Sequence, residues 1–196
     1  MTGNIILLNG VSSAGQSDAL PALQGQTVLD LGCGVGDLAA EFVNRGARVI
    51  GVDINEELLR EAWARQLPNA EFRAGDLRAL PDFEIAADGL WCSFAAAYFP
   101  ALPTALAAWA RSLRPDGWIT LTEIDDLFGH EPLSLRTKVL FRSYAEGAFA
   151  AGGYDFHMGR KLRAHLEGAG FRTRSCHSLD RPARKCWTPG DLASTG

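Results

Sequence analysis

Short apolar runs alternate along the chain with longer segments in which apolar residues recur every three or four positions. The short runs are typical of strands buried in a sheet, and they cover residues 28–31, 48–53, 70–77, 89–94, 117–123 and 171–179. The longer segments have the period of amphipathic helices, and they cover residues 37–44, 56–66, 102–113, 134–151 and 159–169. Strands that alternate with helices in this way predict a parallel sheet covered by helices.

The predicted fold class is α/β, with a Rossmann-like, doubly wound and mostly parallel sheet that carries helices on both faces. Such sheets bind ligands at the carboxyl ends of their strands. With 196 residues and 47% hydrophobic content, the chain can bury the core of one domain. The pattern divides it into an N-terminal arm over residues 1–26, a main domain over 27–179 and a C-terminal tail over 180–196 of undetermined structure.

The first strand of the main domain ends in a glycine-rich turn beside a carboxylate. Gly32, Gly34 and Gly36 let the backbone approach a ligand closely, and Asp30 adds a negative charge next to that turn. A dinucleotide-binding loop would need a third glycine where this chain has Asp37. Carboxylates on both sides of the turn would repel a pyrophosphate, so a ligand with a cation is expected.

This run resembles the first motif of the class I S-adenosylmethionine-dependent methyltransferases, D/E-x-G-x-G-x-G. The cofactor of that family carries an ammonium group and a sulfonium. The resemblance extends over roughly residues 27 to 178 and is closest to the enzymes that methylate small molecules. It implies that Asp30, Gly32, Cys33 and Gly34 bind S-adenosylmethionine.

Acidic residues also end the next two strands. Asp53 follows the glycine turn at the distance of about 20 residues where a nucleotide site has its ribose-binding acid. The resemblance implies that Asp76 accepts from the adenine amino group, with the Leu77 backbone beside the ring, Ile54 on its face and Ser93 also at the cofactor. A purely structural interpretation remains open, in which the glycines serve packing and Asp53 and Asp76 are helix N-caps.

Fewer residues point to the acceptor, and no catalytic residue is assigned. A general base is needed only where the acceptor loses a proton, and histidine is the usual choice. His130 follows the fifth predicted strand, His157 lies between two predicted helices, and Tyr98 follows the fourth strand in an apolar segment. Each also has a structural interpretation, as a loop or capping histidine, an exposed linker residue or a core tyrosine. The segment after the fourth strand lacks the Asn/Asp-Pro-Pro-Tyr/Phe signature, which disfavours nucleobase and glutamine methylation.

The N-terminal arm contains a second candidate motif. Residues 10–17 resemble the phosphate-binding loop of chloramphenicol phosphotransferase-like kinases, but Gln16 stands where that loop needs a lysine. The alternative is an arm that covers the cofactor pocket or packs on the sheet. The methyltransferase sheet usually closes with an antiparallel seventh strand, for which residues 184–187 are the only candidate. The sheet edge is therefore expected to be incomplete or completed by another chain.

Composition excludes several other classes of function. The net charge of −4 gives no general attraction to nucleic acid or acidic membranes. No membrane span or signal peptide is recognised, so a cytoplasmic location is expected. The four cysteines show no metal-type spacing, and we expect reduced thiols and no metal. The oligomeric state is not predicted.

These patterns together predict an S-adenosylmethionine-dependent methyltransferase that moves a methyl group to a small organic acceptor by in-line displacement. Two alternatives remain from other classes. One is a module that binds the cofactor without turnover, and the other is a P-loop nucleotide-binding protein.

Overall fold

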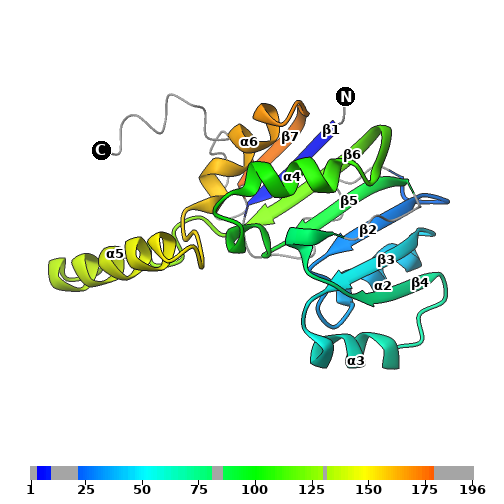
Figure 1. Ribbon diagram of the computed structural model, residues 1–196, viewed down its shortest axis with the longest axis horizontal. Helices are drawn as coiled ribbons and strands as arrows, with labels where there is room; N and C mark the ends of the chain where they lie inside the picture. The colour runs from blue at the N-terminus through cyan, green and yellow to red at the C-terminus, as the bar shows by residue number, and fades with distance from the viewer. Residues whose placement is uncertain (1–3, 10–21, 81–85, 130–131, 179–196) are drawn as a thin grey trace.

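A parallel sheet in the order β4-β3-β2-β5-β6-β1-β7 forms the centre of the protein (Figure 1). The computed structural model describes residues 4–9, 22–80, 86–129 and 132–178. The strands are β1 (Asn4–Asn9), β2 (Thr27–Leu31), β3 (Arg48–Asp53), β4 (Ala70–Ala74), β5 (Ala87–Ser93), β6 (Leu113–Glu123) and β7 (Arg172–Ser178). The helices are α2 (Asp37–Asn44), α3 (Glu56–Ala64), α4 (Leu102–Ala110), α5 (Leu135–Ala150) and α6 (Met158–Gly168), with short 3₁₀ turns η2 (Leu77–Ala79) and η3 (Ala96–Tyr98).

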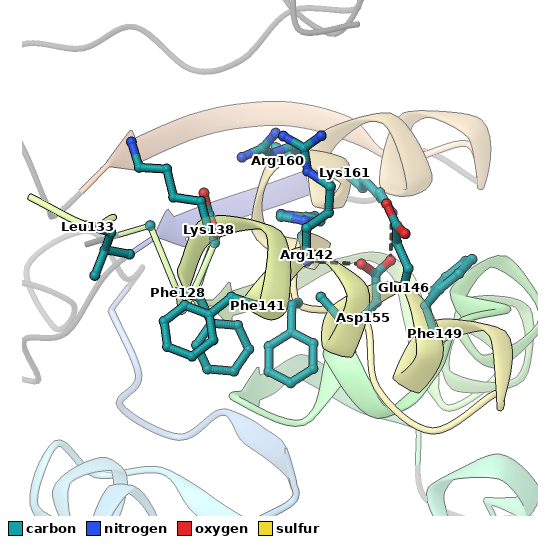
Figure 2. Close-up of a pocket in the computed structure, with 15 residues that line it drawn as sticks. Phe128, Leu133, Lys138, Phe141, Arg142, Glu146, Phe149, Asp155, Arg160 and Lys161 are labelled. Atoms are coloured by element: carbon teal, nitrogen blue, oxygen red, sulfur yellow. Dashed lines mark hydrogen bonds and ion pairs between the residues drawn. The ribbon is translucent and has the colours of Figure 1, made fainter. Parts of the chain in front are cut away.

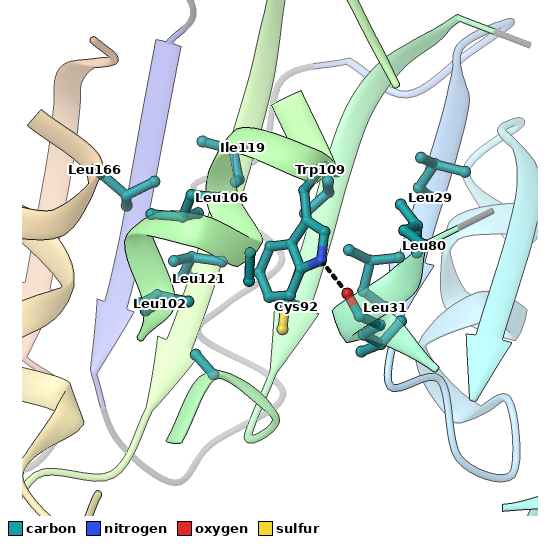
Figure 3. Close-up of a cluster of buried hydrophobic side chains, with 14 of the residues drawn as sticks. Leu29, Leu31, Leu80, Cys92, Leu102, Leu106, Trp109, Ile119, Leu121 and Leu166 are labelled. Carbon is teal, nitrogen blue, oxygen red and sulfur yellow. Dashed lines mark hydrogen bonds between the residues drawn. The ribbon is translucent and has the colours of Figure 1, made fainter. Parts of the chain in front are cut away.

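Each face of the sheet has its own hydrophobic core. On one face, Leu106 and Trp109 of α4 and Leu166 of α6 pack against strand residues such as Ile119 (Figure 3). On the other face, α2 and α3 cover the sheet, and Phe42 of α2 meets Trp91 of β5 edge to face with ring centroids 5.3 Å apart. Helices on both faces confirm the predicted doubly wound α/β fold.

Two strand boundaries differ from the prediction. β4 ends at Ala74, three residues early, because Asp76 turns away from the sheet and caps η2 through the Arg78 N–H. β6 begins at Leu113, four residues earlier than the predicted start at residue 117. Leu113 pairs with Ala87, and the next pair is Trp118 with Gly89. The register shifts between these two pairs, and Asp116, whose φ is 65°, lies in the irregular stretch between Leu113 and Trp118.

The seventh strand comes from the N-terminal arm. β1 lies between β6 and β7 and pairs in parallel with both, from Asn4 beside Trp118 and Arg172 onward. Its apolar run is typical of a strand buried between parallel neighbours. The expectation that the sheet would be incomplete, or completed by another chain, is therefore wrong. Residues 184–187 lie outside the described residues.

One cysteine also differs from the prediction. Cys33 and Cys92 are buried free thiols, as expected. Cys176 in β7 is disulfide-bonded, so the expectation of four reduced thiols is wrong for this residue. Disulfide formation depends on the approach of two side chains in space, which sequence spacing does not reveal.

Helix α5 extends away from the body of the domain (Figure 1). Ala145 is its only buried residue, whereas Leu135, Val139, Leu140 and Tyr144 are each at least 60% exposed. Within the described residues, no helix combines the length and apolar character needed to cross a membrane.

Candidate functional site

The loop after β2 wraps over the end of β3. The backbone N–H groups of Gly32 and Cys33 donate to the Val52 carbonyl at 2.8 and 3.2 Å. Gly34 has a φ of 53°, and a Cβ added there would meet nothing within 4 Å. The loop therefore exposes bare backbone to open space at the carboxyl ends of β2 and β3.

Asp53 ties this loop to β3. Its Oδ2 accepts from the Gly34 N–H and its Oδ1 from the Asn55 N–H, both at 2.8 Å. An ionised carboxylate has about four acceptor sites, so capacity remains for ligand hydroxyls. The N-cap of α3 is Asn55, which accepts from Glu57 and Leu58. The structure thus removes the interpretation of Asp53 as a helix cap.

Asp30 is a buried carboxyl group, 2% exposed, at the end of β2. Its Oδ2 has no hydrogen-bond partner among the described residues. Burial and, as a smaller effect, the charge of the nearby Asp53 together raise the pKa of Asp30 to about 7. A cation bound beside it would satisfy the orphaned oxygen, so this group fits the ammonium of S-adenosylmethionine.

The cysteine between these glycines is not a reactive thiol. Cys33 is 8% exposed, and burial together with the charges of Asp30 and Asp53 raises the pKa of its thiol. A protonated thiol is a poor nucleophile, so Cys33 lines the loop and takes no part in covalent chemistry.

The residues expected at an adenine ring follow β3 and β4. Ile54 is 64% exposed, and Asp76 is held by the Arg78 guanidinium, which lowers the pKa of Asp76. Asp76 caps η2, as the structural interpretation expected. The Leu77 carbonyl accepts from the buried Trp109 indole N–H at 2.9 Å (Figure 3), and Ser93 is the half-buried last residue of β5.

The segment after β5 is fixed by two buried acids that the sequence analysis did not assign. Glu123, which is fully buried, accepts from the Ala97 N–H at 2.9 Å, and the Ala97 carbonyl accepts from the Asp155 N–H at 2.8 Å. Glu123 is the last residue of β6 as Asp53 is the last residue of β3, and this position was the available signal. The contact of Asp155 with Ala97 has no counterpart in the sequence pattern.

The three residues predicted to contact the acceptor differ in how the structure places them. Tyr98 is 61% exposed, so it is not a core tyrosine, and its ring meets Tyr154 edge to face at 4.9 Å. His157 is half-buried at the N-cap of α6, and its Nδ1 has no hydrogen-bond partner within the described ranges. His130 lies outside the described residues.

A pocket of about 870 Å³ lies between α5, α6 and the loop after β6 (Figure 2). Its apolar walls include Phe128, Phe141 and Phe156, and His157 also lines it. The size is within the range of small-molecule sites, roughly 300–1,000 Å³. The sequence pattern does not predict this pocket, because its residues meet only when the two helices are packed.

Residues 28–117 match the family described as Methyltransferase domain. The matched segment contains the glycine loop and the strand-end acids Asp30, Asp53 and Asp76. This segment is therefore similar in sequence to the class I S-adenosylmethionine-dependent methyltransferases. The predicted family resemblance is thereby confirmed, and S-adenosylmethionine is the cofactor of this domain family.

Similar proteins are methyltransferases of several kinds. Nocamycin O-methyltransferase of Saccharothrix syringae is 42% identical over 113 residues, covering 54% of this chain and 40% of the relative. The ubiquinone biosynthesis O-methyltransferase of Paracidovorax citrulli (strain AAC00-1) is 33% identical over 116 residues, covering 57% and 49%. The chain thus spans less than half the length of these two curated relatives.

A solved structure extends the similarity. Phosphoethanolamine N-methyltransferase 1 of Haemonchus contortus, in complex with phosphoethanolamine and S-adenosylhomocysteine, has a TM-score of 0.56 at 25% identity. The similarity covers 62% of this chain and 27% of that chain. The methyltransferase domain of the present chain therefore has the fold of an enzyme crystallised with the product of this cofactor.

Proposed function

We propose that this protein transfers a methyl group from S-adenosylmethionine to an oxygen atom of a small organic acceptor by in-line displacement. The observation that carries the proposal is the Asp53 carboxylate at the Gly34 N–H, beside open space in a segment that matches the methyltransferase domain family. The choice of oxygen rests on the names of the two curated relatives, both O-methyltransferases.

The cofactor would be held along the carboxyl ends of β2, β3, β4 and β5. Asp30 receives the ammonium group, and the backbone of Gly32, Cys33 and Gly34 follows the methionine portion. Asp53 accepts from the ribose hydroxyls. Ile54, Asp76 and Leu77 would surround the adenine ring, and Ser93 would also contact the cofactor. When bound, S-adenosylmethionine supplies a methyl group that is electrophilic because it sits on a sulfonium.

The chain's own contribution to the reaction is orientation and the removal of one proton. The Glu123 and Asp155 contacts fix the backbone of Ala97, which keeps Tyr98 at the carboxyl end of β5. Holding the acceptor oxygen in line supplies much of the rate. His157, or His130, would take the hydroxyl proton of an alcohol or phenol as a general base.

The remaining parts of the proposal concern partners and location. The net charge of −4 supports a small molecule as the partner and no nucleic acid. The free thiols of Cys33 and Cys92 support a cytoplasmic location, whereas the disulfide at Cys176 counts against it. The phosphate-binding loop predicted over residues 10–17 lies outside the described residues.

Calorimetric titration with S-adenosylmethionine and S-adenosylhomocysteine tests the cofactor site, with ATP as competitor. We expect saturable binding that Asp53→Ala abolishes and Glu71→Ala leaves unchanged, because Glu71 is an exposed acid on β4 that pairs with Arg73. Binding of ATP alone would overturn the proposal in favour of a nucleotide-binding protein. Cofactor binding without S-adenosylhomocysteine release from any hydroxylated acceptor would favour the non-catalytic module.

A further inference from the structure

We propose that the pocket between α5 and α6 binds the methyl acceptor, and that this acceptor is a planar aromatic compound carrying an anionic group. The term acceptor rests on the proposed function. The ligand chemistry is argued from the pocket itself, whose lining combines stacked phenylalanines with cationic side chains of α5 and α6 (Figure 2).

Three phenylalanine rings in the lining of the pocket pack against one another. Phe128 stacks on Phe141 with centroids 4.6 Å apart and planes 19° apart, and Phe156 lies 4.8 Å from Phe128 at 30°. The outer faces and the edges of such a group of rings can contact a further aromatic ring, by offset stacking or edge to face. The wall therefore favours a planar ligand over a branched aliphatic one of the same volume.

Two of the four cations that line the pocket are already neutralised. Lys161 contacts the buried Asp155 at 2.7 Å, and the Arg160 Nε contacts both oxygens of Asp125 at 2.9 and 3.0 Å. These pairs fix the base of the pocket. The other two cations are Lys138 and Arg142, and of these Arg142 has the guanidinium group that can bind a ligand anion with two hydrogen bonds.

Arg142 is exposed on α5, one turn after Lys138, and both side chains line the pocket. The guanidinium of Arg142 presents its N–H donors in a planar fork, which matches the two oxygens of a carboxylate. The carboxylates of Asp126 and Glu146 also line the pocket. The anion is therefore bound by the fork of Arg142 rather than by the overall charge of the pocket.

The pocket is connected to the carboxyl end of β5 through a row of aromatic rings. Phe156 meets Tyr154 at 4.6 Å, and Tyr154 meets Tyr98 at 4.9 Å. Asp155, between the two rings in sequence, donates its N–H to the Ala97 carbonyl. A ligand in the pocket is thus next to the segment that follows β5, on the sheet edge where the cofactor residues lie.

The test measures ligand binding without cofactor, using 6-hydroxy-2-naphthoate as the aromatic anion and 2-naphthol as its neutral counterpart. We expect Arg142→Gln to weaken naphthoate binding about tenfold or more and to leave 2-naphthol binding unchanged, since only the anion uses the charge-assisted hydrogen bonds. Arg136→Gln is the matched control, because Arg136 is exposed on the same helix and does not line the pocket.

A second pair of variants tests the aromatic wall. Phe141→Ala is expected to weaken both probes, whereas Leu140→Ala, an exposed neighbour outside the pocket, leaves both unchanged. Circular dichroism checks that the variants are folded. Absence of saturable naphthoate binding, or an equal loss with Arg136→Gln, would overturn the inference.

The outcomes separate this inference from the proposed function. Naphthoate binding that depends on Arg142 supports the pocket even if S-adenosylmethionine does not bind. Cofactor binding without naphthoate binding overturns the pocket proposal and leaves the methyltransferase proposal in place.

Discussion

The Asp53 carboxylate accepts a hydrogen bond of 2.8 Å from the backbone N–H of Gly34, which joins the end of β3 to the loop after β2. The two residues are 19 positions apart in sequence, and adjacent parallel strands bring them together. One carboxylate therefore shapes the glycine loop at the carboxyl end of β3, where we propose that the cofactor binds.

Replacing Asp53 by asparagine should weaken both the loop and the binding of the cofactor. The amide keeps the size of the side chain but sets an NH₂ group against a backbone N–H, because both carboxylate oxygens are acceptors here. We expect a loss of about 1–3 kcal/mol in the free energy of unfolding and a loss of affinity for S-adenosylhomocysteine of roughly tenfold or more. Urea unfolding and calorimetry measure the two effects, and unchanged affinity would remove Asp53 from the site.

The raised pKa of Asp30 predicts that the stability of the cofactor-free protein depends on pH. Its pKa is about 7 in the folded protein against 3.8 ordinarily. Between these values Asp30 holds a proton in the folded state that it has lost in the unfolded state. The contribution of Asp30 to the free energy of unfolding is therefore highest below pH 4 and falls as the pH rises to 7. The contribution is about 1.4 kcal/mol per pH unit in that window.

The comparison that isolates Asp30 is the difference in unfolding free energy between the wild type and Asp30→Asn at pH 5, 6, 7 and 8. The wild type should lose stability relative to the variant up to about pH 7, and the difference should then level off. Glu71→Gln is the control, since its arginine neighbours lower the pKa of Glu71 and its titration ends below this range. A constant difference for Asp30→Asn would contradict the assignment.

The sequence predicted the ends of β2, β3 and β6 because each was marked locally, whereas β4 ends before Asp76, which was expected to lie at its end. Asp30, Asp53 and Asp76 each follow a short apolar run, and parallel strands bring their carboxyl ends to one edge. The helix α2 was predicted at its observed bounds for the same reason, since its amphipathic period is local.

The parts that were missed depend on contacts between distant segments. Nothing in residues 4–9 indicates that Asn4 pairs with both Trp118 and Arg172, and the glycines that follow resembled a phosphate-binding loop. Likewise, α5 has the helical period, but only the packed structure shows that its apolar side chains are largely exposed and that Phe141 stacks on Phe128.

Glu123→Gln should destabilise the acceptor side of the site. Both of its carboxylate oxygens accept backbone N–H groups, from Ala97 at 2.9 Å and Ile124 at 3.0 Å, in a fully buried position. The amide loses one of these bonds, which costs about 1–3 kcal/mol. Thr122→Val is the control, because the buried Thr122 hydroxyl has no partner among the described residues and its removal should be neutral or stabilising. Equal losses in urea unfolding for both variants would show that Glu123 acts only through packing.

Trp109→Phe should weaken cofactor binding from a distance. The buried Trp109 indole donates to the Leu77 carbonyl at 2.9 Å, so phenylalanine leaves that carbonyl unsatisfied under the proposed adenine site. The expected cost is about 1–3 kcal/mol in the free energy of unfolding, with a several-fold loss of affinity for S-adenosylhomocysteine because η2 is no longer held. Trp63→Phe is the matched control, since the half-exposed Trp63 indole donates to the Phe72 carbonyl at 3.0 Å on β4. Affinity that falls equally in both variants would mean that η2 is not the element that positions the adenine ring.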